Sequence, residues 1–165
     1  MRSISKKRDG RAYKPRGAVA IELALVIVVM LFIVAAIVEF GRVFWYADAL
    51  TKATRDGARL MSKWPAEDIS SSGVNAAKNL AVDAANDANV SPFLDPATNV
   101  LVECLGPSPS FSVIPCIDGS PPANVRVSVT NFNVTIGTLA PFINLYGTVF
   151  GNIPLAPHTT MRYLN

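Results

Sequence analysis

Gly17 and Glu22, near the N-terminus, have residue types and a spacing that suit proteolytic processing and subunit pairing. Gly17 offers a backbone that a protease can draw into an extended conformation, and cleavage after it would leave Ala18 with a free α-amine. The Glu22 carboxylate of a neighbouring copy could neutralise this amine in an apolar setting and set the axial register between subunits. Alternatively, the Glu22 side chain extends to the membrane interface or pairs with Arg16, so the spacing alone leaves both interpretations open.

Cys104 and Cys116 are the two cysteines of the chain, and they flank a Pro-rich stretch. In an oxidising compartment this arrangement predicts a disulfide, and closing so short a loop would add about 3 kcal/mol of stability in the chain-entropy model. Two independent thiols are the alternative. We expect no metal site, because the sequence has no CxxC pair and a single histidine, His158.

The sequence contains no motif that supports catalysis. It lacks G-x-S-x-G, a phosphate-binding P-loop, H-E-x-x-H and a dinucleotide fingerprint. His158 lies next to Pro157, and nothing in the sequence places a nucleophile beside it. We therefore expect a protein that is not an enzyme and that takes neither a cofactor nor a small-molecule substrate.

An apolar run occupies residues 18–38 and contains one charge, Glu22. As a helix it spans roughly 31 Å at about 1.5 Å per residue, which matches a hydrocarbon core of about 30 Å. A cleaved signal peptide is the alternative, but its apolar core usually has about 7–15 residues. The nearest A-x-A pattern after the run, at residues 47–49, also lies well past it. The sequence therefore predicts a transmembrane helix.

Positive charge is concentrated before this helix. The formal charge of the chain is +3, yet residues 1–16 alone carry +6, so the remainder is −3. A basic arm can bind nucleic acid, but beside an apolar run the positive-inside rule keeps it in the cytoplasm. We expect a single-pass protein of the inner membrane with a cytoplasmic N-terminus, a C-terminal domain on the far side of the membrane and no nucleic-acid partner.

The helical pattern continues beyond the membrane. Apolar side chains recur at three- and four-residue spacing as far as Trp64, opposite a basic stripe, and Pro65 is a stop signal. The stripe consists of Lys52, Arg55, Arg59 and Lys63. One helix is thus predicted over residues 18–63, and Gly57 is a point where it bends or where another element approaches closely. This divides the chain into a basic cytoplasmic leader (1–17), a transmembrane helix (18–40), its amphipathic continuation (41–64) and a periplasmic α+β domain (65–165).

The remaining pattern predicts a second helix followed by strands. The helix covers residues 74–88, with N-caps supplied by the serines at 70–72. Strands are predicted at 99–104, 124–130 and 159–164, and packed or Pro-rich loops at 106–122 and 138–157. Because the strands follow the helices and leave no room for crossovers, the fold class is α+β with a small antiparallel sheet on which the long helix packs.

Three segments of the long helix resemble the TadE-like family: 16–25 (RGAVAIELAL), 37–42 (IVEFGR) and 53–59 (ATRDGAR). Members of this family are minor pseudopilins of the bacterial tight-adherence (Tad/Flp, type IVb) pilus. The resemblance implies a pilin-like fold, cleavage by a prepilin peptidase between Gly17 and Ala18, and a role for Glu22 in assembly. It also implies that the partners are the prepilin peptidase, other pseudopilins and Tad assembly proteins.

The resemblance separates some family members from others. Leu23 stands where many Flp-type prepilins have a tyrosine, which argues against the major pilin, and the chain has no room for the large additional domain of TadG-like proteins. A TadF-like role stays open, as does the choice between the inner membrane and the filament. From another functional class, an uncleaved single-pass protein with a periplasmic binding or sensing domain is the alternative. Gly17 together with Glu22 favours the pseudopilin, because a plain anchor needs neither.

Overall fold

We describe residues 16–137 and 152–165 of the computed structural model. Most of the predicted leader and most of the predicted loop at 138–157 lie outside these residues. The described chain combines two helices, two short helical turns and six strands. The predicted α+β class with a long N-terminal helix on a small antiparallel sheet is confirmed, and the architecture is consistent with a pilin-like fold.

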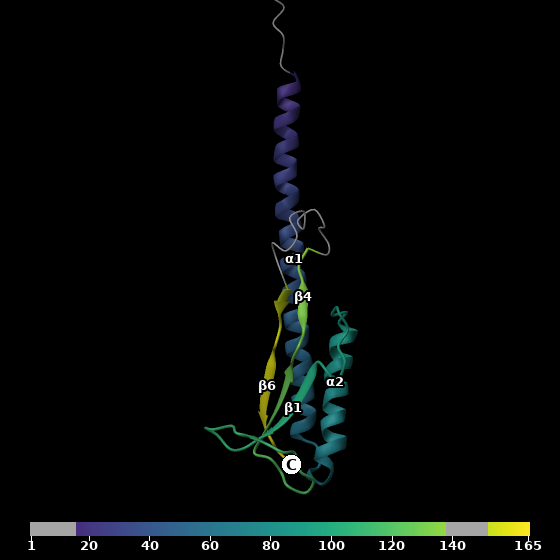
Figure 1. Cartoon of the computed structure of the whole chain (residues 1–165), viewed down its shortest axis with the longest axis vertical. Coiled ribbons are helices and arrows are strands. Elements are labelled where there is room, and N and C mark those ends of the chain that lie inside the picture. The colour runs from purple at the N-terminus through teal and green to yellow at the C-terminus, as the bar shows by residue number, and fades with distance from the viewer. Residues whose placement is uncertain (1–15, 138–151) are drawn as a thin grey trace, which may run out of the picture.

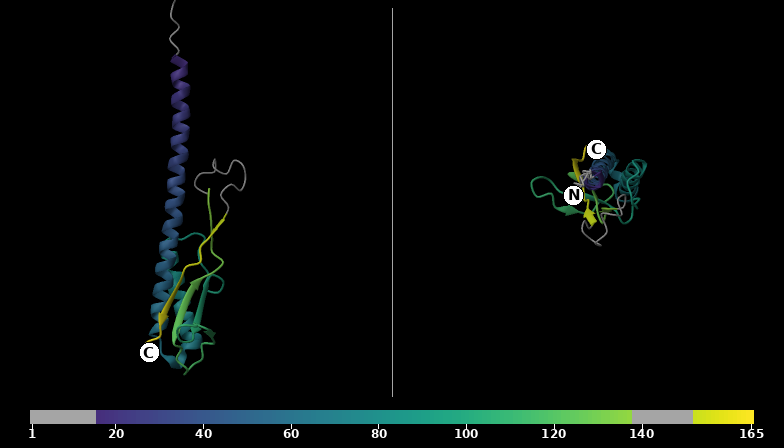
Figure 2. Two further views of the ribbon diagram at one scale, coloured as in Figure 1. Left: turned by 90° about the vertical axis from the view of Figure 1, so that its left-hand side faces the viewer. Right: turned by 90° about the horizontal axis from the view of Figure 1, so that it is seen from above.

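The helix α1 (Arg16–Ser62) runs through the whole molecule and begins and ends within two residues of the prediction. Its N-terminal part projects alone beyond the domain, as Figures 1 and 2 show in purple and blue. Apolar side chains in this part are exposed, and the helix is long and apolar enough to cross a membrane. Its C-terminal part buries one face, which includes Tyr46, Leu50 and Met61.

The helix α2 (Val74–Asp87) packs beside the C-terminal part of α1 (Figure 1). Gly57 allows this close approach. A Cβ atom at Gly57 would lie 3.0 Å from the carbonyl oxygen of Ala77 and 3.3 Å from the Cβ of Ala81. The expectation that another element approaches the chain at this glycine is therefore confirmed.

The connection between the helices differs from the prediction. It consists of the 3-10 turn η1 (Ala66–Asp68) and the π-helical turn η2 (Ile69–Gly73). The prediction that the serines at 70–72 cap α2 is wrong, because the N-cap is Gly73 and no side chain bonds there. Ser70 lies inside η2 and is engaged elsewhere, by Asp118.

A four-stranded antiparallel sheet covers the two helices. The strand order is β2-β1-β3-β6, with β1 at Val100–Leu105, β2 at Val113–Ile114, β3 at Asn124–Val129 and β6 at His158–Arg162. In the central strand β3, Val125, Val127 and Val129 are buried, as their alternation predicted. The edge strand β6 packs on α1, where the hydroxyls of Thr54 and Thr159 lie 3.1 Å apart.

Two short strands were missed in segments that we predicted to be loops. Strand β2 lies within the segment 106–122 and pairs with β1. Strand β5 (Asn152–Pro154) belongs to the segment 138–157 and pairs with β4 (Asn133–Thr135) in a separate ribbon. With two or three residues each, these strands show no alternation of their own and depend on the longer chain segments beside them.

Candidate functional site

The predicted processing and pairing residues occupy the first turns of α1. Gly17, Ala18 and Glu22 are all exposed, and a Cβ atom at Gly17 would meet nothing within 4 Å. Ala18 and Glu22 are four residues apart, so they share one face of the helix at an axial separation of about 6 Å. This geometry leaves the peptide bond after Gly17 and the Glu22 carboxylate open to approach by another molecule.

The local structure of Gly17 bears on proteolysis. Because α1 begins at Arg16, the bond between Gly17 and Ala18 lies within the first helical turn. The first four N–H groups of a helix have no intrahelical acceptor, and helix ends fray. A protease therefore has to unwind only one weakly bonded turn to bring the backbone around this bond into an extended conformation. Glycine opposes that change least.

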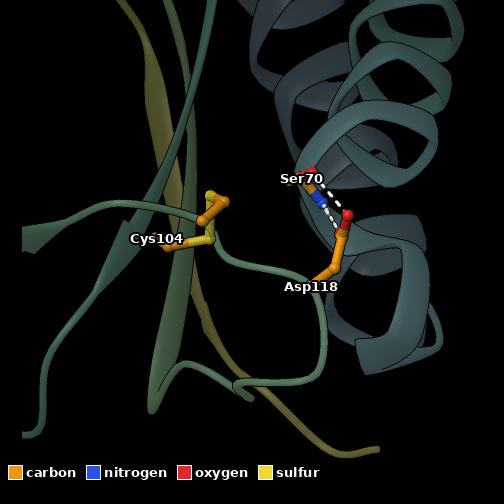
Figure 3. Close-up of a disulfide and its surroundings, with 4 residues drawn as sticks. Ser70, Cys104 and Asp118 are labelled. Atoms are coloured by element: carbon orange, nitrogen blue, oxygen red, sulfur yellow. Dashed lines mark hydrogen bonds between the residues drawn. A yellow bond between two sulfur atoms is a disulfide. The ribbon is translucent and has the colours of Figure 1, made fainter.

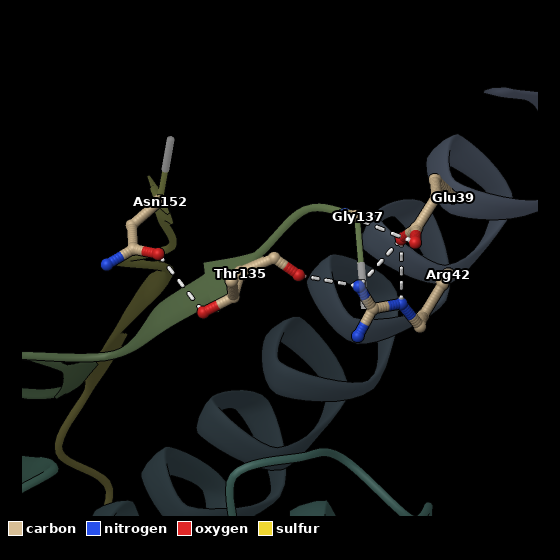
Figure 4. Close-up of polar contacts among 5 residues, drawn as sticks. All are labelled: Glu39, Arg42, Thr135, Gly137 and Asn152. Carbon is tan, nitrogen blue, oxygen red and sulfur yellow. Dashed lines mark hydrogen bonds and ion pairs between the residues drawn. The ribbon is translucent and has the colours of Figure 1, made fainter. Parts of the chain in front are cut away.

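A buried ion pair lies where α1 leaves the domain (Figure 4). The Glu39 side chain is almost fully buried and accepts hydrogen bonds from the guanidinium of Arg42 at 2.7 and 3.3 Å. The Gly137 N–H donates to the other carboxylate oxygen at 3.2 Å. Arg42 in turn donates to the carbonyl oxygen of Thr135 at 2.7 Å. The pair thus ties the end of β4 to the long helix.

The surroundings of Arg42 keep this residue charged. Burial lowers its pKa, but hydrogen bonds to Glu39 and Tyr46 and the charge of Glu39 outweigh burial, so the pKa of Arg42 is raised. In the sequence, Glu39 and Arg42 stand out only as members of a segment that resembles the TadE-like family. The available signal was two opposite charges three residues apart, directly after an apolar run. Nothing in the sequence points to Thr135 and Gly137 as their partners.

The distal end of the domain is held by the predicted disulfide (Figure 3). Cys104 in β1 is bonded to Cys116, which follows β2, with a Cα–Cα distance of 5.3 Å. Beyond Cys116, Asp118 accepts hydrogen bonds from the backbone N–H and the hydroxyl of Ser70 at 2.7 and 2.8 Å. These bonds, that of the backbone first, lower the pKa of Asp118. The loop is therefore attached both to the sheet and to the turn before α2.

One comparison with known proteins gives a match, and the matched residues lie in the long helix. Residues 17–59 match the family model described as TadE-like protein. No curated protein and no solved structure matches the chain. The match begins at Gly17, includes Glu22, Glu39 and Arg42, and ends three residues before α1 does. The resemblance predicted from the sequence is confirmed: this chain carries a TadE-like segment, and that segment is its long helix.

Proposed function

We propose that this chain is a minor pseudopilin, a structural and non-enzymatic component that helps to assemble or anchor a Tad (Flp, type IVb) pilus. In this proposal a prepilin peptidase removes the leader by cleaving between Gly17 and Ala18. The TadE-like match supports a role in a Tad system, and its first matched residue is Gly17. The long apolar helix and the small antiparallel sheet suit such a subunit.

The proposed location is the bacterial inner membrane, with the N-terminus in the cytoplasm and the folded domain in the periplasm. The charge of +6 over residues 1–16 supports this orientation, because basic residues beside a spanning helix are retained on the cytoplasmic side. The disulfide between Cys104 and Cys116 suits an oxidising compartment. Both observations favour the same side of the membrane for the domain.

The observation that carries the proposal is the exposed Glu22 carboxylate one turn from Ala18 on an otherwise apolar surface. A carboxylate in a spanning segment is costly unless it finds a partner. Cleavage after Gly17 creates such a partner, because the new α-amine of Ala18 in a neighbouring copy has the opposite charge. An uncleaved anchor would have no use for this arrangement.

The proposal is tested by the mass of the protein isolated from its native membrane. We expect a mature chain that begins at Ala18. Gly17→Val should block cleavage, because glycine has no side chain and the bulk of valine would keep the backbone from entering the peptidase site. Gly10→Val makes the same change elsewhere in the leader and should leave cleavage intact. A wild-type chain that retains residues 1–17 while pili form normally would overturn the proposal and favour a single-pass binding or sensing protein.

A further inference from the structure

Exposed aromatic side chains gather at one end of the domain. Among the described residues beyond the apolar run, the exposed aromatic side chains are those of Phe40, Phe44, Trp45, Phe93 and Phe111. Phe111 lies in the loop between β1 and β2, at the distal end (Figure 1). The other four lie toward the projecting part of α1, and we refer to them as the aromatic collar. Each side chain of the collar is at least 57% exposed, so the fold leaves these rings uncovered.

Contacts at the end of α2 place Phe93 near the height of Trp45 along α1. The helix α2 runs toward the projecting part of α1 (Figure 1), and the indole N–H of Trp45 donates to the carbonyl oxygen of Ala88 at 3.1 Å, directly after α2 ends. Phe93 is held beside the last turn of α2 through its neighbour Leu94. The backbone N–H of Leu94 donates to the Asn86 side chain at 2.9 Å, and the amide of that side chain donates back to the Leu94 carbonyl oxygen at 3.3 Å. Phe93 and Trp45 therefore belong to different elements but lie at a similar height.

This height corresponds to a membrane interface. Phe40 is two residues beyond the end of the apolar run and Trp45 is seven, which is about 3 Å and about 10 Å along the helix axis. The headgroup layer extends about 5–8 Å outward from the hydrocarbon core, and helical side chains point back toward the N-terminus, which here is the membrane side. The rings on α1 therefore reach the layer in which aromatic side chains of membrane proteins are enriched.

The domain begins directly at the end of the apolar run, which brings Phe93 close to the bilayer as well. Glu39 is the first residue after the run, and it already accepts a hydrogen bond from Gly137 at 3.2 Å. Spanning helices tilt by about 20° on average, and a tilt toward α2 lowers an element about 10 Å from the axis by about 3 Å. Phe93 then lies about 7 Å from the hydrocarbon core, within the headgroup layer.

The directions of the rings distinguish a membrane from a protein partner. Phe44 and Trp45 are consecutive, so they project about 100° apart around α1. Phe93 lies on the loop that follows α2. These rings share a height along α1 and not one face of the domain. A second copy or another protein would cover one face, whereas a bilayer surface contacts every side of the domain at one height.

We propose that the domain lies directly on the bilayer surface, with the aromatic collar in the lipid headgroup layer and Phe93 as its contact outside α1. This contact is separate from the proposed role in pilus assembly and rests only on the proposed membrane location. Residues 80–99 contain no lysine or arginine, and Asp87 and Asp95 are exposed on either side of Phe93 in the sequence. Because anionic headgroups would repel these carboxylates, the surface that fits the collar is zwitterionic.

The test measures the depth of single tryptophans in the full-length chain, reconstituted into phosphatidylcholine vesicles that carry a nitroxide at the headgroups of both leaflets. Trp64→Phe leaves Trp45 as the only tryptophan. Phe93→Trp, combined with Trp45→Phe and Trp64→Phe, reports on the loop after α2. Leu164→Trp in the same background is the matched control, because Leu164 is 70% exposed at the distal end. The nitroxide should quench Trp45 and the Phe93→Trp reporter several-fold more than the Leu164→Trp reporter.

Two outcomes would overturn the contact between the domain and the bilayer. Equal quenching of the Phe93→Trp and Leu164→Trp reporters would mean that the domain stands clear of the lipid, even if Trp45 is quenched. Protection of the Phe93→Trp reporter from a water-soluble quencher, without quenching by the lipid, would mean that protein covers this site, as in docking between copies.

A Val28→Trp reporter in the same background separates this contact from the proposed membrane location. A nitroxide placed deep in the acyl chains should quench it, because Val28 lies in the middle of the apolar run. If Val28→Trp is quenched and Phe93→Trp is not, the membrane location stands and the domain contact is wrong. If Val28→Trp is not quenched, the helix does not span the bilayer, and both the location and the contact are wrong.

Discussion

At the scale of single residues, burial separates two ion pairs of α1 that look alike in the sequence. Glu39 and Arg42 are three residues apart, Asp48 and Lys52 four, and both pairs close at 2.7 Å. The Glu39 side chain is only 4% exposed, whereas that of Asp48 is 59% exposed. An exposed pair gains little over hydration, but a buried carboxylate depends on its partner. The first pair should therefore matter much more for stability.

We expect Arg42→Met to lower the free energy of unfolding by roughly 2 kcal/mol, because it leaves Glu39 buried without its cation while retaining an apolar stem. The figure is below the range for a fully buried pair because Arg42 is partly exposed. Lys52→Met, the matched control, should change stability by less than about 0.5 kcal/mol. Denaturant unfolding of the full chain in detergent measures both. Equal effects in the two variants would contradict the assignment.

Asp118 gives the domain a pH-dependent attachment. Its pKa is lowered in the folded chain by the hydrogen bonds from Ser70. A lowered folded pKa contributes stability above the unfolded pKa, and this contribution is lost as pH falls through the folded pKa. Asp118→Asn should therefore be less stable than wild type at neutral pH, and the difference should vanish in acid. Melting temperatures of both chains from pH 7 to pH 2 test this. A difference that stays constant would show that the charge is irrelevant.

At the scale of elements, two glycines of α1 have opposite roles. Gly41 has nothing within 4 Å of a Cβ position, whereas at Gly57 a Cβ atom would lie 3.0 Å from a backbone oxygen of α2. Gly41→Ala should stabilise the chain by up to about 1 kcal/mol, because alanine is the better helix former. Gly57→Leu should destabilise it by roughly 1–3 kcal/mol, because α2 has to move away. Unfolding of both variants measures this, and a stable Gly57→Leu chain would contradict the close packing.

The elements that were predicted correctly are those with long periodic patterns in the sequence. The apolar run, the amphipathic continuation and Pro65 predicted α1 to within two residues of its ends. The alternating valines of β3 predicted both the strand and its buried face. These signals are strong because many residues along one element face the same core, so every residue repeats the same information.

The predictions that failed concern parts of the fold that depend on contacts between distant segments. The serines at 70–72 look like helix caps, but Ser70 is bonded to Asp118, 48 residues away. Strand β5 exists through its pairing with β4, and the environment of Glu39 is completed by Gly137, 98 residues away. A local pattern contains no information about such partners. The Cys104–Cys116 pairing was the exception, because the chain has no other cysteine.

At the scale of the whole molecule, one continuous helix connects the projecting apolar end to the folded domain (Figure 2). The helix has 47 residues and is therefore about 70 Å long. The Glu39–Arg42 pair fixes the domain to this helix where the two separate. In the proposed assembly, a shift imposed at Glu22 by a neighbouring copy would be carried along this continuous helix to the domain. This is why we expect an effect on assembly from a residue far from the domain.

Glu22→Gln tests that coupling. The change keeps the size of the side chain and removes its charge, so the proposed pairing with a neighbour's Ala18 amine would be lost while the bond after Gly17 stays accessible. We expect cleavage to survive and the number of pili to fall, as measured by intact mass and filament counts. Asp48→Asn neutralises a carboxylate of α1 outside the apolar run and should leave both unchanged.

Two results would contradict this role for Glu22. Normal piliation in Glu22→Gln would mean that the carboxylate only reaches the membrane interface, as the alternative interpretation holds. Loss of cleavage would mean that the peptidase itself requires the charge, and the fall in pili would then follow from the retained leader. Gly17→Val is the comparison for the second case. It blocks cleavage with Glu22 intact, so it shows what a retained leader alone does to the number of pili. If Glu22→Gln is cleaved but lacks pili while Gly17→Val lacks both, then processing and register are separate requirements, and Glu22 acts in the second.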